Sequence, residues 1–235
     1  LAPKRLLHLL RDVLQCLPTM MTLIRRVRPS LTVVNTITIP FWILASRLCR
    51  VPVICHVHEA EQSAKPIVKR LLYLPLLACT GLVVNSQFSL NVLTDTWPRV
   101  ARFARVVYNG VPGPRHPVRP RAILEGPIRL LFLGRLSPRK GPQVAIEAAR
   151  LLVADGLDVS LGLLGAVFPG YEWFESELVE RVQGSGLSER VEFLGFDPDV
   201  WSQLAACDIV LVPSTVDEPF GNTAVEAMLA LRPLV

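Results

Sequence analysis

The sequence predicts an α/β protein with two Rossmann-like domains, each built on a doubly wound parallel sheet. Apolar runs of four to seven residues alternate with helical patterns throughout the chain, which is typical of such sheets. A proline-rich stretch at residues 113–127 interrupts the alternation and separates two series of elements. The sequence has no internal repeat of the length found in solenoid proteins. We therefore expect one domain on either side of the proline-rich stretch.

The first series of elements occupies residues 1–112. Residues 1–28 are rich in Leu and Arg and predict a helix that is interrupted near Pro18. Strands are expected where β-branched and apolar residues run together, and helices where the apolar period lengthens. The strands are expected at residues 30–36, 51–59, 81–86 and 105–112, the last as a short strand with a turn, and the helices at residues 40–49, 66–78 and from Ser89 onward.

The second series occupies residues 128–235. Residues 113–127 hold four prolines and two glycines without a hydrophobic period, which predicts a linker. Pro142 stands in the first turn of an expected helix, a position that tolerates proline. The strands are expected at residues 128–135, 159–164, 190–195 and 208–212, and the helices at residues 142–154, around 173–182, after Asp199, and after Gly221, where Asn222 or Thr223 would be the cap.

Charge divides unevenly between the two halves of the chain. Residues 1–112 carry 14 Lys and Arg against 4 Asp and Glu, a net charge of +10, and residues 113–235 carry 11 against 16, a net charge of −5, which together give the +5 of the chain. Such an excess indicates that the first half faces something anionic, such as a membrane surface or a phosphorylated substrate. Aromatic residues are few and are not interleaved with cations, so nucleic-acid binding is not expected.

The cysteines and the uncharged stretches indicate in which cellular compartment the protein is expected. The five cysteines are scattered and lack Cys-x-x-Cys spacing, which indicates buried free thiols in a reducing compartment. Arg11 and Asp12 interrupt the first apolar run, so a secretory signal peptide is not expected. Residues 29–46 and 71–94 lack charge, yet their polar and β-branched residues argue against membrane spans. We therefore expect a cytoplasmic protein.

Two carboxylates flank the expected start of the last helix. Glu218 lies in the loop and Glu226 about one turn into the helix, with seven residues between them. The first amides of a helix have no internal partner, so they bind anions. Carboxylates beside them would repel a phosphate alone but would accept hydrogen bonds from hydroxyls. The pattern therefore favours a sugar nucleotide, which carries both groups, and the alternative is an ordinary capped helix with Glu226 in water.

A second loop supplies positive charge. Gly134 ends an apolar strand, and Arg135 and Lys140 follow before the helix that begins at Pro142. Glycine lets a backbone approach a ligand closely, and Arg135 and Lys140 add positive charge from one loop. The alternative is a plain connection between a strand and a helix, with exposed cations.

A third candidate position is the end of the strand at residues 51–59. His58 and Glu59 stand there, and functional residues gather at the carboxyl ends of strands in an open parallel sheet. His56 shares a face of the strand with His58, but no third ligand of a suitable kind stands nearby, so a zinc site is not expected. The alternative is a core or capping histidine.

Motifs of several other enzyme classes are absent from the sequence. No Gly-x-Gly-x-x-Gly follows a strand, no Walker-type phosphate loop occurs, and no Gly-x-Ser-x-Gly marks a hydrolase nucleophile. Asp197-Pro198-Asp199 has the Asp-x-Asp form of a metal-binding pair, but Asp199 precedes a helix and is interpreted as its cap. We expect neither a metal nor a bound cofactor.

The segment from Glu218 to Glu226 resembles a known motif. Glu218-Pro219-Phe220-Gly221-Asn222, followed by Glu226-Ala227-Met228, is similar to the Glu-x7-Glu motif of retaining glycosyltransferases with the GT-B fold, of the group 1 or family 4 type. Gly134-Arg135 with Lys140 resembles the Gly-Arg-x4-Lys pattern of the same family. The resemblance covers nearly the whole chain and is strongest from about residue 128 onward.

The resemblance implies a role for each candidate residue. Glu218 and His58 would hold the transferred sugar and are the expected catalytic residues, with His56 as the second choice for the histidine. Glu226 would accept the ribose hydroxyls, and the two cations of the first loop would hold the diphosphate. The donor-binding set that the resemblance implies is Gly134, Arg135, Lys140, Phe220, Gly221, Asn222, Thr223 and Glu226.

The implied activity is the transfer of a sugar, with retention and without a metal, from a nucleotide-diphosphate sugar to an acceptor hydroxyl. The acceptor would be a glycan, a glycolipid or a lipid-linked sugar, and the basic first half would make a peripheral membrane contact. Residues 1–112 would form the acceptor-side domain and residues 128–235 the nucleotide-sugar-binding domain. Two alternatives stay open: a non-catalytic nucleotide-sugar-binding fragment, and a GT-B sugar-nucleotide epimerase.

The sequence departs from the family pattern at three places. The glycine-rich loop after the family's first strand is not matched, and neither are the elements that follow the position of Val235, so both domains are expected to be incomplete. Leu231 stands where the pattern has glycine after the last helix. A left-handed conformation there would cost a branched residue about 1 kcal/mol.

Overall fold

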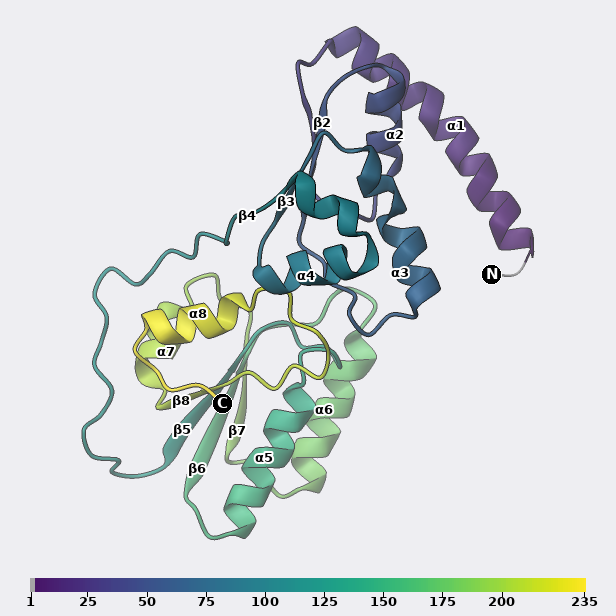
Figure 1. Ribbon diagram of the computed structural model, residues 1–235. Coiled ribbons are helices and arrows are strands. Elements are labelled where there is room, and N and C mark those ends of the chain that lie inside the picture. Colours follow the sequence, from purple (N-terminus) through teal and green to yellow (C-terminus); the bar gives the residue numbers. More distant parts are fainter. Residues whose placement is uncertain (1–2) are drawn as a thin grey trace. The chain divides into compact units, whose positions relative to one another are not determined.

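A computed structural model of the chain describes residues 3–235, with side chains described from Gln15 onward. These residues form two compact units, which Figure 1 shows as ribbons. Unit 1 comprises the described residues through Asn109 together with Asp217–Phe220, and unit 2 comprises Gly110–Val216 together with Gly221–Val235. In the described structure, the predicted linker at residues 113–127 contains no helix or strand.

Unit 1 is built on a parallel sheet whose four strands lie side by side in sequence order. The strands are β1 (Thr32–Val34), β2 (Val53–Val57), β3 (Gly81–Val84) and β4 (Ala104–Val106). The helices are α1 (Pro3–Val27), α2 (Phe41–Leu48), α3 (Pro66–Tyr73) and α4 (Gln87–Thr96), with the 3₁₀ turns η1 (Leu74–Ala78) and η2 (Pro98–Arg102). Alternate residues of β2, Val53, Cys55 and Val57, are buried and form the centre of the core.

Unit 2 is built on a second parallel sheet, in the order β7-β6-β5-β8. The strands are β5 (Ile128–Leu133), β6 (Val159–Leu164), β7 (Val191–Gly195) and β8 (Ile209–Leu211). The helices are α5 (Pro142–Ala154), α6 (Glu172–Gly184), α7 (Trp201–Ala206) and α8 (Asn222–Leu229). The chain leaves β5 toward β6 on one side and later returns to β8 on the other, so the strand order reverses between β5 and β8.

Helices cover both faces of the unit 2 sheet, as Figure 1 shows. Leu130 and Phe132 of β5 pack with α5 and α6 on one face, whereas Leu131 between them packs with α7 and α8 on the other. Apart from Arg129 near its start, the strand is apolar because both of its faces are buried. The predicted fold class, two doubly wound parallel sheets, is therefore confirmed, and α5 and β6 have the predicted bounds.

Three local predictions are wrong, at Pro18 and at the caps of α7 and α8. The N-cap of α7 is Val200, without a side-chain cap, rather than the predicted Asp199. Helix α1 continues through Pro18, although an interior proline costs about 3 kcal/mol. The packing of α1 on α2, which buries Ile24, stabilises the helix despite that cost. At the start of α8 the N-cap is Gly221, in a left-handed conformation and without a side-chain cap, so Asn222 is already helical. The left-handed conformation expected at Leu231 is present, with φ of 61°.

A buried carboxylate fastens the predicted linker to unit 2. Asp208, just before β8, accepts hydrogen bonds from Nε of Arg121 at 2.8 Å and from the amide of Arg129 at 2.8 Å. Nη1 and Nη2 of Arg121 donate to the carbonyl oxygens of Glu125 and Pro127. Burial raises the pKa of Asp208, but hydrogen bonds from Arg121 and Arg129 lower it more, so this pKa lies well below its ordinary value. The charge of Asp208 therefore stabilises the folded state.

We expect Asp208→Asn to lower the free energy of unfolding of unit 2 by about 2 kcal/mol at neutral pH, because hydrogen bonds to a charged group are lost. Because the folded pKa is depressed, this stabilisation is present above the unfolded pKa and is lost as the pH falls below about 4. Urea denaturation across that pH range measures both effects. The wild type should approach the stability of the variant at acid pH, and a constant difference at every pH would contradict the assignment.

Arg232 is a second buried charge, with 3% of its surface exposed. Its Nε donates to the Leu204 carbonyl oxygen at 2.8 Å and its Nη2 to the Ala205 carbonyl oxygen at 2.7 Å, both in the last turn of α7. Its Nη1 donates to the carbonyl oxygens of Val118 and Ala230. The guanidinium thus satisfies carbonyl groups that the end of a helix leaves without partners.

None of the described helices combines the length and the apolarity that crossing a bilayer requires. The uncharged stretches at residues 29–46 and 71–94 instead contribute strands and helices to unit 1. All five cysteines have free thiols, and Cys55, Cys79 and Cys207 are buried. In the described part of the chain, no three His, Cys, Asp or Glu side chains are grouped closely enough to hold a metal ion.

Candidate functional site

The reversal of strand order in unit 2 brings two loops together. The loop after β5, residues 134–141, and the loop after β8, residues 212–221, leave the carboxyl ends of adjacent strands. The amide of Thr215 donates to the Arg139 carbonyl oxygen at 3.0 Å, and its Oγ1 donates to the Pro138 carbonyl oxygen at 3.1 Å. Ligands of open α/β sheets bind in the crevice at such a point, so the topology alone marks this edge as the candidate site.

Two glycines set how closely the loop after β5 approaches its two neighbours, the loops after β8 and β6. A Cβ atom on Gly141 would lie 2.1 Å from the Pro213 carbonyl oxygen, and one on Gly165, after β6, would lie 1.8 Å from the Gly134 carbonyl oxygen. Both glycines also have positive φ, 76° for Gly141 and 151° for Gly165. Glycine is required at both positions because any side chain would push one loop away from the other.

The start of α8 is fastened to the same edge of the sheet. Gly221 is buried and turns the chain into the helix, and Oγ1 of Thr223 donates to the Leu133 carbonyl oxygen at 3.3 Å. This bond places the first turn of α8 next to Gly134. The first turn of α8, whose amides have no partner within the helix, therefore lies beside the loop that carries Arg135 and Lys140.

Glu226 lies in the second turn of α8 and is half-buried. Burial raises the pKa of its carboxyl. Within the described residues, no group donates a hydrogen bond to this carboxylate or pairs with it. A partly desolvated carboxylate without a donor is destabilised, and a ligand hydroxyl would relieve that cost.

A cavity of ≈ 460 Å³ opens beside Gly134 and Arg135. The Arg135 guanidinium lies over the Phe168 ring, with Cζ 3.5 Å from the ring centroid. Burial, and secondarily the charge of Arg139, lower the pKa of Arg135 from its ordinary value. Phe196, which is 76% exposed, lines the same cavity. The cavity thus offers a cation and two aromatic rings next to the helix start.

Sequence reasoning missed the contributions of the loops after β6 and β7. Gly165, Phe168, Phe196 and Asp197 line the cavity, yet none of them was predicted as a site residue. The available signal was position, because each of these residues closely follows a strand in a sheet whose neighbouring loops were predicted to bind a ligand.

His58 follows β2 in unit 1. Its Nε2 lies 2.8 Å from Oδ1 of Asn35, which follows the neighbouring strand β1. The ring centroid of His56 lies 3.9 Å from that of His58, so the two rings share a face as predicted. Burial, and secondarily the charge of His58, lower the pKa of His56. Glu59 accepts hydrogen bonds from the Thr36 hydroxyl and from the His58 amide, which fixes the end of the strand.

The segment Asp217–Phe220 packs with unit 1. The amide and Oγ of Ser63 both donate to Oδ2 of Asp217 at 3.0 Å, and the Phe220 ring centroid lies 6.2 Å from that of Tyr108. The predicted residues therefore divide between the units. Unit 1 holds His58, Glu218 and Phe220, and unit 2 brings together Gly134, Arg135, Lys140, Gly221, Asn222, Thr223 and Glu226.

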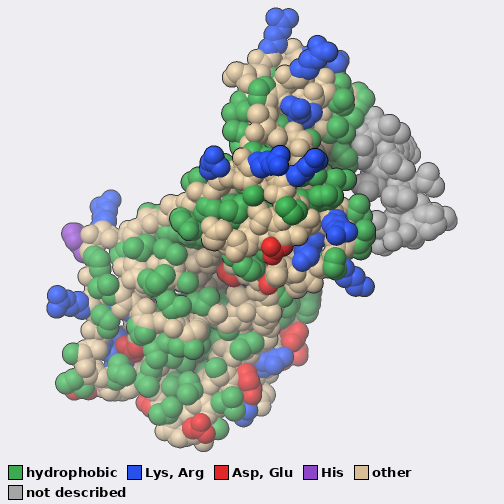
Figure 2. All heavy atoms as spheres, in the orientation of Figure 1, with side chains coloured by type: hydrophobic (Ala, Val, Ile, Leu, Met, Phe, Trp, Pro, Cys, Tyr) green, Lys and Arg blue, Asp and Glu red, His purple; other side chains and the backbone are tan. Residues whose placement is uncertain are grey.

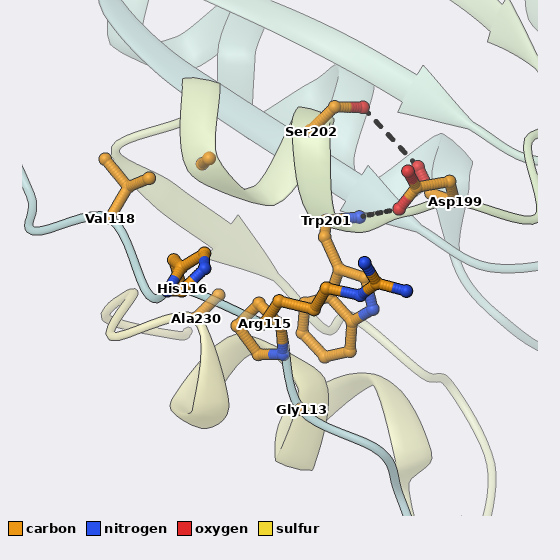
Figure 3. Close-up of a pocket in the computed structure, with 10 residues that line it drawn as sticks. Gly113, Arg115, His116, Val118, Asp199, Trp201, Ser202 and Ala230 are labelled. Carbon is orange, nitrogen blue, oxygen red and sulfur yellow. Dashed lines mark hydrogen bonds between the residues drawn. The ribbon is translucent and has the colours of Figure 1, made fainter.

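A larger cavity of ≈ 630 Å³ lies between the linker and α7 in unit 2. Figure 3 shows Arg115 and His116 of the linker near Trp201, with hydrogen bonds joining Asp199 to the Trp201 amide and to Ser202. Among the described residues that line it, none belongs to the predicted donor-binding set. This larger cavity and the candidate site are therefore different places.

Comparison with known proteins identifies the family. The profile described as "Glycosyl transferases group 1" matches residues 118–235, and the profile described as "Glycosyltransferase Family 4" matches residues 2–112. The chain is 27% identical over 214 residues to the 2-deoxystreptamine glucosyltransferase of Streptomyces kanamyceticus, which covers 81% of this chain. It is 31% identical over 172 residues to the D-inositol 3-phosphate glycosyltransferase of Geodermatophilus obscurus, which covers 66% of it.

A solved structure of similar fold is that of Anabaena Alr3699/HepE in complex with UDP and glucose, with a TM-score of 0.75 and 26% identity over 94% of this chain. The present chain spans 61% of that protein, 54% of the Streptomyces relative and 37% of the Geodermatophilus relative. The two matched profiles, the two parallel sheets and the similar structures agree. The chain belongs to the group 1 glycosyltransferases of the GT-B fold.

Proposed function

We propose that the protein transfers a sugar from a nucleotide-diphosphate sugar to an acceptor hydroxyl, with retention and without a metal ion, and that unit 2 binds the donor. UDP-glucose or a related UDP-sugar is the first donor to test, because Anabaena Alr3699/HepE, 26% identical to this chain, was solved in complex with UDP and glucose. The acceptor class we propose is a glycan, a glycolipid or a lipid-linked sugar.

The half-buried Glu226 carboxylate carries this proposal. It lies one turn after the first amides of α8, at the point where the strand order reverses. The amides attract a phosphate, whereas the carboxylate repels one and attracts hydroxyls. A nucleotide presents both groups at a fixed spacing, and its ribose hydroxyls would relieve the desolvation that raises the pKa of Glu226.

Departure of the nucleoside diphosphate develops negative charge on its phosphates. In our proposal Arg135, Lys140 and the first amides of α8 stabilise this charge, in the place of a metal ion. Glu218 and His58 hold the hydroxyls of the transferred sugar and orient its anomeric carbon. The aromatic cavity beside Arg135 receives the nucleoside, with Phe168 or Phe196 available for stacking on the base.

We place the protein in a reducing, cytoplasmic compartment, and the five free thiols support that assignment. Two other functions of the family's fold predict different products. A sugar-nucleotide epimerase would convert the donor without an acceptor, whereas a non-catalytic binding protein would bind the donor and release no nucleoside diphosphate. Incubating donor sugars with and without acceptor hydroxyls, and measuring free nucleoside diphosphate, separates the three.

The ribose role of Glu226 is tested by titration calorimetry with UDP and with 2′-deoxy-UDP. We expect Glu226→Gln to weaken UDP binding about tenfold, because a hydrogen bond to a charged acceptor becomes a neutral one. Binding of the deoxy analogue should weaken less, since it presents one hydroxyl fewer. The matched control is Glu180→Gln, which makes the same charge change at an exposed position on α6. Equal losses for the two nucleotides would refute the ribose role, and no UDP binding by the wild type would refute the proposed donor.

A further inference from the structure

Helix α3 in unit 1 exposes an apolar stripe. Ile67, Leu71 and Leu74 follow one another at spacings of four and three residues, so they lie on one face of the helix and of the turn that continues it. Their exposed fractions are 62%, 64% and 48%, and that of the neighbouring Val68 is 48%. The opposite face is anchored in the core by the fully buried Tyr73. The stripe is thus held rigidly at the surface.

Cations accompany this stripe. Lys65 at the N-cap of α3 and Arg70, next to Leu71, are both exposed. Nε1 of Trp97 donates to the Arg70 carbonyl oxygen at 3.2 Å, which brings the start of η2, with its exposed Arg99 and Arg102, beside α3. Residues 60–102 carry five Lys and Arg against two Asp and Glu. In Figure 2, Lys and Arg side chains and hydrophobic side chains face the viewer together over α3.

We propose that α3 docks unit 1 on an anionic lipid bilayer, with the stripe in the interface and the cations at the headgroups. A soluble protein rarely leaves four large apolar side chains exposed together on two helical turns without a partner. An apolar face combined with an excess of Lys and Arg fits an anionic membrane surface in particular. This inference deepens the proposed function, because a lipid-linked or glycolipid acceptor would be presented at that surface.

The sequence predicted a peripheral membrane contact for the basic first half of the chain, and α1, with Arg25 and Arg26 in its last turn, is another basic helix of that half. The side chains of residues 3–14 lie outside the described part of the chain. In the described half of α1, Ile24 is buried, and Gln15, Thr19 and Leu23 line an apolar cleft that includes Trp42 of α2. Leu23 and Val27 are also exposed, so α1 supplies a comparison for α3 within the same unit.

The test is sedimentation of the whole chain with vesicles of phosphatidylcholine alone and of phosphatidylcholine mixed with phosphatidylglycerol. We expect binding to the mixed vesicles, with weaker binding at high salt. Ile67→Ser with Leu71→Ser should reduce the partition coefficient about a hundredfold, at about tenfold for each buried side chain. Lys65→Glu with Arg70→Glu should reduce it at least about twenty-five-fold at low salt, since each cation contributes about fivefold at an anionic surface.

Three controls keep the outcomes separate. Leu151→Ser, at an apolar position on α5 of unit 2 that is 50% exposed, should leave vesicle binding unchanged, and so should Leu23→Ser with Val27→Ser on α1. UDP binding is measured on every variant and should not change, so failure of the membrane inference and failure of the proposed donor are read independently. Absence of binding to mixed vesicles would overturn the inference. The inference would also be overturned if the α1 variant lost vesicle binding and the α3 variant kept it. It would be overturned as well if the wild type formed a stable dimer that the α3 variant abolished without any loss of vesicle binding.

Discussion

Gly165→Ala should weaken UDP binding about a hundredfold while leaving the rest of unit 2 folded. The new Cβ would lie 1.8 Å from the Gly134 carbonyl oxygen and 2.8 Å from its carbonyl carbon, so the two loops must separate by more than an ångström. The Gly134 amide, which donates to the Leu164 carbonyl oxygen at 3.0 Å, would move with its loop. Displacements of this size in a binding loop cost about two orders of magnitude in function. Calorimetric titration with UDP measures the loss.

A second glycine provides the control for this prediction. A Cβ on Gly184, at the end of α6, would meet no atom within 4 Å, and its φ is not in the positive range. Gly184→Ala should therefore bind UDP like the wild type and unfold at the same or a higher urea concentration, because alanine favours helix by up to about 1 kcal/mol. If Gly165→Ala also bound UDP like the wild type, the close approach of the loops would not be needed for the donor.

Arg232→Met should lower the free energy of unfolding of unit 2 by about 3–5 kcal/mol. The substitution keeps an apolar stem but removes donors to the carbonyl oxygens of Val118, Leu204, Ala205 and Ala230. Methionine cannot donate to any of them, and the site is 97% enclosed, since only 3% of the arginine surface is exposed. Buried acceptors without donors carry their full desolvation cost. Urea denaturation at neutral pH measures the change.

Arg150→Met is the matched substitution at the surface. Arg150 pairs with Glu147 on α5, with Nη2 2.7 Å from Oε1, but both side chains are exposed to water. Its loss should cost less than about 1 kcal/mol. Arg232→Lys separates charge from geometry, because lysine retains the cation but cannot reach acceptors in several directions at once. A cost for Arg232→Met no larger than that for Arg150→Met would show that water replaces the guanidinium.

The central elements of unit 2 could be predicted from the sequence because their patterns are dictated locally. Helix α5 starts at Pro142, whose fixed φ suits a first turn, and β6 is an uninterrupted apolar run. The neighbourhood of Gly134, Thr223 and Glu226 followed from topology, since loops at the carboxyl ends of neighbouring parallel strands meet.

Other features depend on contacts that no local pattern contains. The cap of α8 lies at Gly221 because a left-handed turn, with φ of 81°, precedes the helix, whereas polar side chains at Asn222 and Thr223 gave the stronger local signal. The stacking of Arg135 on Phe168 joins loops about thirty residues apart. The buried bonds of Arg232 reach three separate segments, and an arginine in the sequence does not reveal whether carbonyl oxygens or water will receive its protons.

The proline-rich stretch that connects the two halves of the chain is bound to unit 2 along only part of its length. In its later part, Val118 is held by Arg232 and Arg121 by Asp208, and both of these partners belong to unit 2. Composition alone predicts that the whole proline-rich stretch is a flexible linker. Because Arg232 and Asp208 hold this segment, residues 118–127 fold as part of unit 2, so a cut made there would divide a folded unit rather than separate two domains.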